Sequence, residues 1–214
     1  MTRKLPKWWL ILLVPCLLTG CGWILQSGPQ KHFYLLQAQR HQQTHRESQD
    51  STLRVEPFSI SQAFQGQQLV LRTEQHEFVQ DYQRRFLIPA QSMLTELTRN
   101  WLARSGLFTH VLPQAPGSVQ ADYQLQGRIE ALYMDLSQKQ PKTILEMEFL
   151  LLGRRDQGLQ ILGQKGMRQE SKLQELSTSE AIQAWSKDLE LILQELEIYL
   201  QRWLKPPTAT ISAD

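Results

Sequence analysis

Cysteine is scarce in this sequence of 214 residues. It has 2 Cys, Cys16 and Cys21, and none after position 21. The rest of the chain therefore folds without a disulfide, and it offers no thiolate for a zinc site or for nucleophilic catalysis. Charge of one sign is also lacking, because 23 Lys+Arg against 21 Asp+Glu give a net charge of +2. This balance argues against the basic surface of a nucleic-acid-binding protein, and we expect no nucleic-acid partner.

Motifs that carry common enzyme chemistries are missing as well. The sequence contains neither a G-x-S-x-G nucleophile elbow nor an H-E-x-x-H zinc motif. Gly163 and Gly166 lie close together, but the residues around them read as a strand rather than as a phosphate-binding loop. We therefore expect no enzyme activity, no cofactor and no metal site.

Two pairs of side chains have a spacing that could serve chemistry. His41 and His45 are four residues apart, as metal-binding histidines on a helix often are, but each has an arginine beside it in a polar segment. Glu146 and Glu148 share one face of an expected strand, where paired carboxylates could exchange protons. We interpret the histidines as part of a solvated loop and the glutamates as the wet side of a strand.

Long hydrophobic runs are represented by one segment, residues 8–18. It is too short to span a bilayer, which needs about 20 residues. It follows three basic residues and ends at Leu18-Thr19-Gly20-Cys21, the order of charge, apolar run and small residues that marks an export signal. The tetrad resembles the lipobox of bacterial lipoproteins, which predicts cleavage between Gly20 and Cys21 and acylation of Cys21. An ordinary signal peptide with a chance cysteine, or an uncleaved anchor, are the alternatives.

A lipid anchor at Cys21 would decide where the protein resides. Each acyl CH₂ placed in lipid contributes about 0.8 kcal/mol, and a second chain converts reversible binding into stable anchoring. The residue after the cysteine is Gly22 and not aspartate, which resembles the pattern of lipoproteins that are sent to the outer membrane. We therefore expect the protein to be anchored on the periplasmic face of the outer membrane. Removing the signal leaves 23 − 3 = 20 Lys+Arg against 21 Asp+Glu, a net charge of −1.

The mature chain divides by composition into three parts. Residues 21–31 contain Ser27, Gly28 and Pro29 and are expected to form a lipidated tether. Residues 32–205 are of a length that suits one domain, and residues 206–214 are expected to be a disordered tail. Within the domain, the polar composition of residues 37–51 predicts a mobile loop.

Alternating hydrophobicity predicts most of the domain to be strand. The clearest case is residues 122–136, where apolar side chains occupy one face and Gln, Arg and Glu side chains the other. The other expected strands are residues 32–36, 53–60, 68–73, 78–86, 108–112, 143–152 and 159–169.

Two amphipathic helices are expected. One begins near Pro89 and ends before Gly106. The other begins at Ser177, where Ser177 to Glu180 fits a capping box, and has an apolar stripe too broad for a narrow coiled-coil seam. These elements predict an α+β domain with one mostly antiparallel sheet and both helices packed on one face.

The order of these segments resembles the ABC-type transport auxiliary lipoprotein component family, which includes paraquat-inducible outer-membrane lipoproteins. The likeness covers nearly all of residues 33–204. The stretches that carry it include Phe33-Tyr34-Leu35-Leu36, Leu53-Arg54-Val55-Glu56-Pro57-Phe58, Leu69-Val70-Leu71-Arg72 and Ala121-Asp122-Tyr123-Gln124-Leu125. Phe86 departs from the pattern, since a tryptophan is expected there.

This resemblance implies a non-enzymatic component of a lipid transport system that links the inner and outer membranes. The implied partners are a periplasmic protein of the mammalian-cell-entry type, its ABC ATPase and permease, and the outer membrane itself through the acyl chains. A homo-oligomer is compatible with it. The alternative is a structural or assembly lipoprotein of an outer-membrane complex unrelated to transport.

Overall fold

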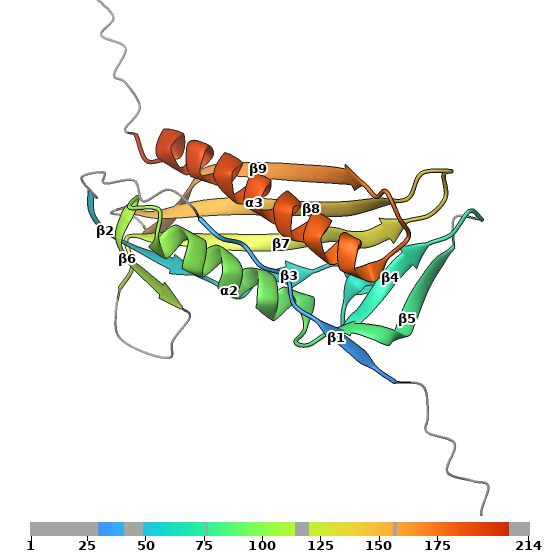
Figure 1. Ribbon diagram of the computed structural model, residues 1–214. Coiled ribbons are helices and arrows are strands. Elements are labelled where there is room, and N and C mark those ends of the chain that lie inside the picture. Colours follow the sequence, from blue (N-terminus) through green and yellow to red (C-terminus); the bar gives the residue numbers. More distant parts are fainter. Residues whose placement is uncertain (1–29, 41–48, 76, 114–119, 156–157, 206–214) are drawn as a thin grey trace, which may run out of the picture. The chain divides into compact units, whose positions relative to one another are not determined.

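The computed structural model describes residues 30–40, 49–75, 77–113, 120–155 and 158–205. The chain divides into two units, residues 1–30 and 31–214, and the sheet and helices described below belong to the second. In that unit, two helices lie across one face of a long sheet (Figure 1).

Three long strands form one side of the sheet, with β9 at its edge, and each runs antiparallel to the next. They are β7 (Tyr123–Asp135), β8 (Lys142–Arg155) and β9 (Gly158–Lys172). In β8, alternate side chains are fully buried under the helices, as the sequence pattern predicts: Leu145, Met147, Phe149 and Leu151.

The other edge of β7 is shared by three short strands, and all of them run parallel to it. In order along β7 they are β2 (Gln49–Val55), β3 (Ser59–Ile60) and β4 (Gln68–Arg72). Three further strands extend the two ends of this edge. β6 (Phe108–Pro113) pairs with β2 in parallel, β5 (Phe78–Phe86) pairs with β4 antiparallel, and β1 (His32–Tyr34) pairs with β5 in parallel.

The sheet is therefore mixed, and the expectation of a mostly antiparallel sheet is wrong. Side-chain alternation places a residue on a face of a sheet, but it carries no information on the direction of the neighbouring strand. The expected strand over residues 53–60 is also divided. At its break, Phe58 is fully buried and its N–H donates to Thr95 Oγ1 (3.0 Å), so the chain turns into the core between β2 and β3.

The two expected helices are confirmed, and they pack on the same face. α2 (Ala90–Ala103) follows Pro89, and α3 (Thr178–Trp203) follows Ser177, whose Oγ accepts from the Glu180 N–H (3.1 Å). The Glu180 carboxylate accepts from the backbone N–H groups of Gln174 and Glu175 (2.6 and 2.8 Å). Glu180 thus caps the preceding turn, which differs from the reciprocal contact of a capping box.

The main core lies between the helices and the sheet. Trp185 of α3 is fully buried there, and its Nε1–H donates to the Ile144 carbonyl of β8 (3.1 Å). Phe58 and Phe149 meet edge to face with their ring centroids 5.8 Å apart. Gly127 makes room for the Phe58 ring, because a Cβ at position 127 would lie 2.5 Å from it.

The opposite face of the sheet carries a smaller apolar cluster and many charges. The cluster is formed by Val70, Ala131, Tyr133 and Ile144, with Phe64 packed against them. Around it, the ion pairs Lys142–Glu170 and Arg168–Glu146 link β8 to β9, and Arg168–Glu170 forms within β9. This face therefore combines a small hydrophobic contact area with a partly solvated charge network.

Candidate functional site

The residues predicted from the lipobox, Gly20 and Cys21, lie outside the described residues, as do His41 and His45. Their assignments stay predictions. Among the residues that the structure describes, no three His, Cys, Asp or Glu side chains gather as a potential metal site. Within the same ranges, neither helix combines the length and apolarity needed to cross a bilayer.

The glutamate pair on β8 belongs to the charged face of the sheet, as expected for the wet side of a strand. Glu146 accepts from Arg168 Nη1 (2.6 Å), and Glu148 accepts from Gln164 Nε2 (2.7 Å). Next to them, hydrogen bonds from Lys142 and Arg168 lower the pKa of Glu170 below its usual 4.5. Each of these carboxylates has a polar partner from β8 or β9, so the arrangement is explained by sheet pairing.

Packing explains Gly163 of the glycine pair on β9, but not Gly166. A Cβ at Gly163 would lie 2.2 Å from the indole of Trp203, whereas a Cβ at Gly166 would meet nothing within 4 Å. Gly163 therefore allows the end of α3 to lie close to β9, and this supports the reading of residues 163–166 as strand.

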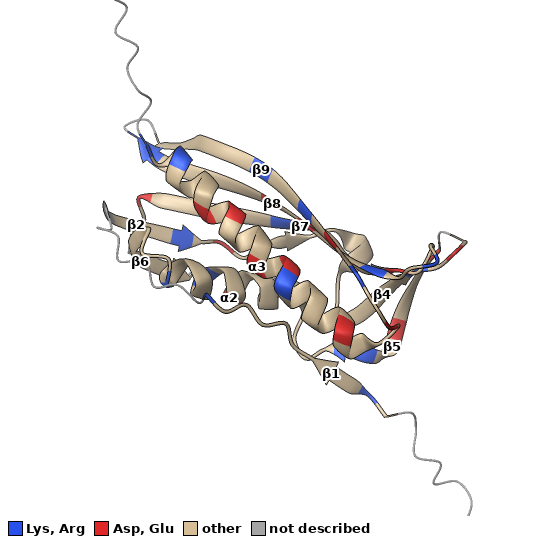
Figure 2. Cartoon of the chain, turned by 45° about the horizontal axis from the view of Figure 1, so that its top comes forward, with Lys and Arg blue, Asp and Glu red and all other residues tan. Residues whose placement is uncertain are grey.

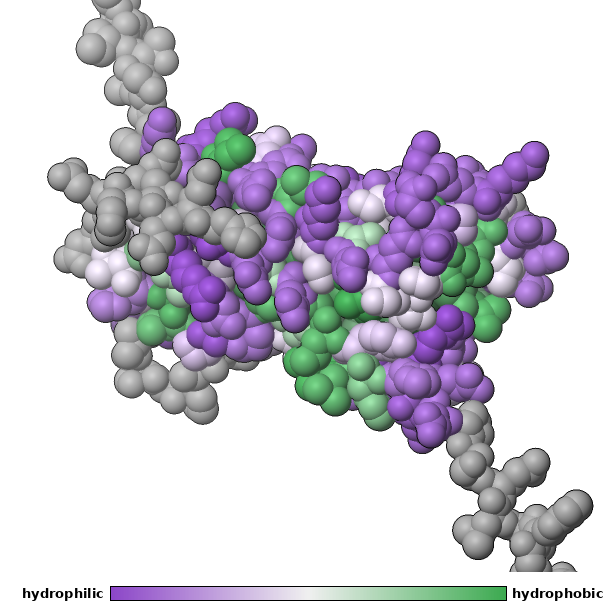
Figure 3. All heavy atoms as spheres, in the orientation of Figure 1, coloured by the Kyte–Doolittle hydropathy of each residue, from purple (hydrophilic) through white to green (hydrophobic). Residues whose placement is uncertain are grey.

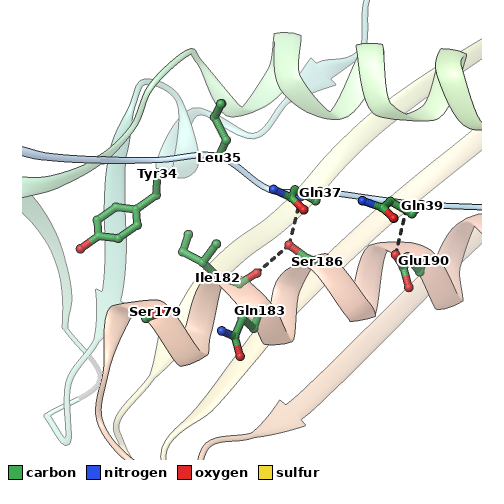
Figure 4. A pocket seen from close by; sticks show the side chains of 9 residues that line it. All are labelled: Tyr34, Leu35, Gln37, Gln39, Ser179, Ile182, Gln183, Ser186 and Glu190. Carbon is green, nitrogen blue, oxygen red and sulfur yellow. Dashed lines mark hydrogen bonds between the residues drawn. The ribbon is translucent and has the colours of Figure 1, made fainter.

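The segment after β1, residues 35–40, contains the clearest feature that the sequence analysis missed. We call it the strap, because it runs as an extended chain between α2 and α3 (Figures 1 and 4). The Gln37 N–H donates to Ser186 Oγ (3.1 Å), and the Gln39 N–H donates to Glu190 Oε1 (2.9 Å). The strap is thus held along α3 by backbone donors and helix side chains.

Two apolar side chains of the strap alternate with these polar contacts and point into the core. Leu36 is 3% exposed and its N–H contacts Met93 Sδ at 3.3 Å, while Ala38 packs against the main core. The expectation that residues 37–51 form a mobile loop is therefore wrong for residues 37–40, and it is also wrong for residues 49–51, which belong to β2. The alternation of Leu36 and Ala38 with Gln37 and Gln39 was the available signal.

The strap ends in a buried ion pair. Arg40 Nε and Nη2 donate to the two carboxylate oxygens of Glu197 (2.7 and 3.1 Å), and Arg40 Nη1 contacts the Arg104 carbonyl after α2 (3.3 Å). The side chains of Arg40 and Glu197 are only 8% and 12% exposed. Trp101 of α2 also donates to Glu197 through its Nε1–H (2.5 Å). One carboxylate thereby links the strap to both helices.

A shallow groove of about 460 Å³ runs beside the strap (Figure 4). Amides, hydroxyls and one carboxylate line it together with Tyr34, Leu35 and Ile182, the large apolar members. The other residues that line it are Gln37, Gln39, Ser179, Gln183, Ser186 and Glu190. The groove is thus equipped for hydrogen bonding rather than for proton transfer.

Exposed apolar side chains gather at the same end of the domain (Figure 3). We call this set the N-terminal patch, and it consists of Phe33, Leu35, Leu87 and Ile88. Phe33 and Leu87 are 52% and 50% exposed. Exposed apolar side chains that gather in this way are typical of interaction surfaces.

Strand register explains why the N-terminal patch faces outward. β1 pairs with β5 so that Tyr34 aligns with Phe86 and Phe33 with Arg85. Phe86 is buried against Trp185 in the main core, so Phe33 and its partner Arg85 point away from that core. Leu87 follows Phe86, so alternation directs its side chain away from the core as well. The Leu87 N–H donates to the Tyr34 carbonyl (2.8 Å), which continues the pairing of the two segments.

A buried carboxylate joins α3 to the sheet. Asp188 is 1% exposed, and it accepts from Thr143 Oγ1 of β8 (3.1 Å) and Ser171 Oγ of β9 (2.5 Å). Burial raises the pKa of Asp188 above its usual 3.8, although both hydroxyls favour the charged form. Since its oxygens are enclosed by the core, we assign it a structural role.

The fold defines the class of protein: an α+β domain in which two helices cover one face of a mixed sheet. A family model described as "ABC-type transport auxiliary lipoprotein component" matches residues 34–197. The chain belongs to this family, which confirms the resemblance seen in the sequence. Its members are described as auxiliary components of transport systems, and the family is not a known enzyme family.

Solved structures share the fold. A protein from Xanthomonas campestris superposes with a TM-score of 0.68 at 18% identity, over 80% of this chain and 96% of that one. A hypothetical protein from Chlamydia trachomatis gives a TM-score of 0.53 at 9% identity, over 71% of this chain and 98% of that one. No curated protein sequence matches this one. At these identities the likeness shows the fold alone.

Proposed function

We propose that this chain is the lipid-anchored docking component of an ABC-type lipid transport system in a bacterial envelope. Cys21 holds it on the periplasmic face of the outer membrane, and the domain binds a periplasmic protein of the mammalian-cell-entry type. The ATPase and permease lie in the inner membrane and supply the energy. The observation that carries this proposal is the family match across residues 34–197.

The order of the chain supports an action close to a membrane. Residues 22–30 separate the predicted lipid-bearing Cys21 from Lys31, the first residue of the folded unit. A chain extends by about 3.3–3.6 Å per residue at most, so this link spans no more than about 35 Å. The domain therefore stays near the lipid surface, whatever conformation the link adopts.

The way in which the domain begins also suits an anchored protein. The tether leads into β1, which is hydrogen-bonded to β5, and the strap that follows is bound to α3 and to the Arg40–Glu197 pair. A force applied through the tether would have to separate these contacts before it could peel the N-terminal segment away. The anchor is thus coupled to the sheet and both helices.

Co-purification from envelopes tests the proposed function directly. The protein would carry a C-terminal tag, and envelopes would be crosslinked, solubilised and affinity-purified, with Cys21→Ala as the matched control. We expect the wild type to recover a mammalian-cell-entry-type protein together with an ABC ATPase and permease. The control should recover less of them, because the unanchored protein is diluted away from its partners.

The same experiment can contradict the proposal. Recovery of only β-barrel assembly proteins would favour a structural or assembly role unrelated to transport. Equal recovery of transport partners by wild type and Cys21→Ala would support the docking role, but it would show that docking does not require the anchor.

A further inference from the structure

The N-terminal patch has the composition of a surface that rests on lipid, and it adjoins the segment that leads to the predicted anchor. We infer that Phe33, Leu35, Leu87 and Ile88 seat the domain on an anionic phospholipid surface, with the β1 end toward the membrane. This inference rests on the proposed function, because it uses the anchor at Cys21. It goes further by assigning the domain a membrane-contact face and therefore an orientation.

Basic and aromatic side chains border the patch in the way that a lipid interface favours. Figure 2 shows basic residues at β1 and the adjoining part of β5. Lys31 is exposed directly before β1, and Arg85 lies beside Phe33, with its Nε donating to the Tyr82 carbonyl (3.0 Å). Tyr82 is 63% exposed, and tyrosine is enriched where membrane meets water.

Asp81, the acidic residue nearest to Arg85 in the chain, is already paired. Asp81 forms an ion pair with Arg84, and backbone N–H groups of Arg84 and Gln83 donate to it as well. Although burial opposes it, these bonds lower the pKa of Asp81 below its usual 3.8, so it stays charged and paired. Lys31 and Arg85 consequently remain to attract anionic headgroups, and each basic residue near such a surface favours binding about fivefold.

The tether decides between a membrane and another occupant. With Cys21 acylated, lipid is always within about 35 Å of Lys31, since extended chain covers at most about 3.3–3.6 Å per residue. A tethered surface meets its target at a high effective concentration, so modest apolar contacts suffice to hold it. A soluble partner has no such advantage at this end of the domain.

A position-specific probe can measure this contact in the lipidated, full-length mature protein. The predicted processing leaves no free thiol, so Leu87→Cys provides a single site for an environment-sensitive fluorophore. Ile198→Cys is the matched control, because Ile198 is 57% exposed on α3. At 1.5 Å per residue it lies about 24 Å further along the helix than Ile182, which lines the groove near β1.

The labelled proteins would be reconstituted in phosphatidylglycerol-containing vesicles that carry nitroxide-labelled lipid. An apolar interfacial segment lies about 5–10 Å into the headgroup and acyl boundary, so quenching at position 87 should be at least about twofold greater than at position 198. Phe33→Asp, at an exposed position, should lower the quenching at position 87 while leaving the melting temperature unchanged. Loss of quenching in this variant would support the inference.

Three results would overturn it. Equal, weak quenching at positions 87 and 198 in protein that sediments with the vesicles would show that the anchor works and the patch does not touch lipid. A probe at position 87 that is shielded from aqueous iodide but not quenched by lipid would show that protein covers the patch. Failure of the protein to sediment with vesicles would instead refute the proposed anchor, and this inference with it.

Discussion

Glu197 offers the most direct test of how the strap is held between the helices. Its carboxylate accepts two hydrogen bonds from Arg40 and one from Trp101. Glu197→Ala would remove all three acceptor contacts and leave the Arg40 guanidinium buried without its carboxylate. We therefore expect the strap to loosen from α3 and the protein to lose stability.

The size of the effect follows from burial. Breaking a buried ion pair by removing one partner typically costs about 3–5 kcal/mol, whereas an exposed pair contributes about 0–1 kcal/mol. The two side chains are 8% and 12% exposed, and Arg40 keeps its contact with the Arg104 carbonyl, so we expect the lower end, about 3 kcal/mol. At about 2–4 °C per kcal/mol for a chain of this size, the melting temperature should fall by about 9 °C.

Thermal denaturation of the purified protein, followed by circular dichroism, measures this change. Gln194→Ala is the matched control, because Gln194 is exposed on the same helix and its loss should change stability little. A double variant, Arg40→Met with Glu197→Met, should recover part of the loss, since apolar replacements often substitute for a buried pair. If Glu197→Ala melts together with Gln194→Ala, the strap is not held by this ion pair.

Three further predictions concern packing, protonation and sorting. Gly163→Ala should destabilise the protein by about 1–3 kcal/mol in denaturant titrations, because its Cβ meets the Trp203 indole, whereas Gly166→Ala should be neutral or slightly stabilising. Burial raises the pKa of Asp188 above 3.8, so its protonation stabilises the fold below that pH, and this contribution is lost as the pH rises through the raised pKa. Relative to Asp188→Asn, wild-type stability should accordingly be greatest in acid and decline toward neutral pH; a constant difference would contradict the assignment. Gly22→Asp should move the protein from outer-membrane to inner-membrane fractions of a density gradient, and an unchanged distribution would refute the sorting prediction.

The sequence predicted the long, regular elements because their patterns are local. The alternation around residues 122–136 corresponds to β7, and the stripe after Ser177 corresponds to α3. Gly106 has a positive φ of 70° just after α2, in agreement with its role as a helix stop. Each of these signals depends on residues a few positions apart, which is why it can be read without knowledge of the fold.

What the sequence could not predict depends on partners far along the chain. β2, β3 and β4 align with the same edge of β7, and only their tertiary pairing makes them parallel. The polar composition of the strap predicts a loop. Its ordered conformation depends on Ser186 and Glu190, which accept its backbone N–H groups and lie about 150 residues later in the sequence. The N-terminal patch likewise needs the register of β1 on β5, which aligns Phe33 with Arg85 and brings the Leu87 N–H to the Tyr34 carbonyl.

Both the proposed function and the membrane-contact face depend on acylation of one side chain, so metabolic labelling with radioactive palmitate is the decisive measurement. The wild-type protein should incorporate label and Cys21→Ala should incorporate none, with the two proteins expressed at matched levels. Equal incorporation in both, or no incorporation in the wild type, would contradict a lipid anchor at Cys21.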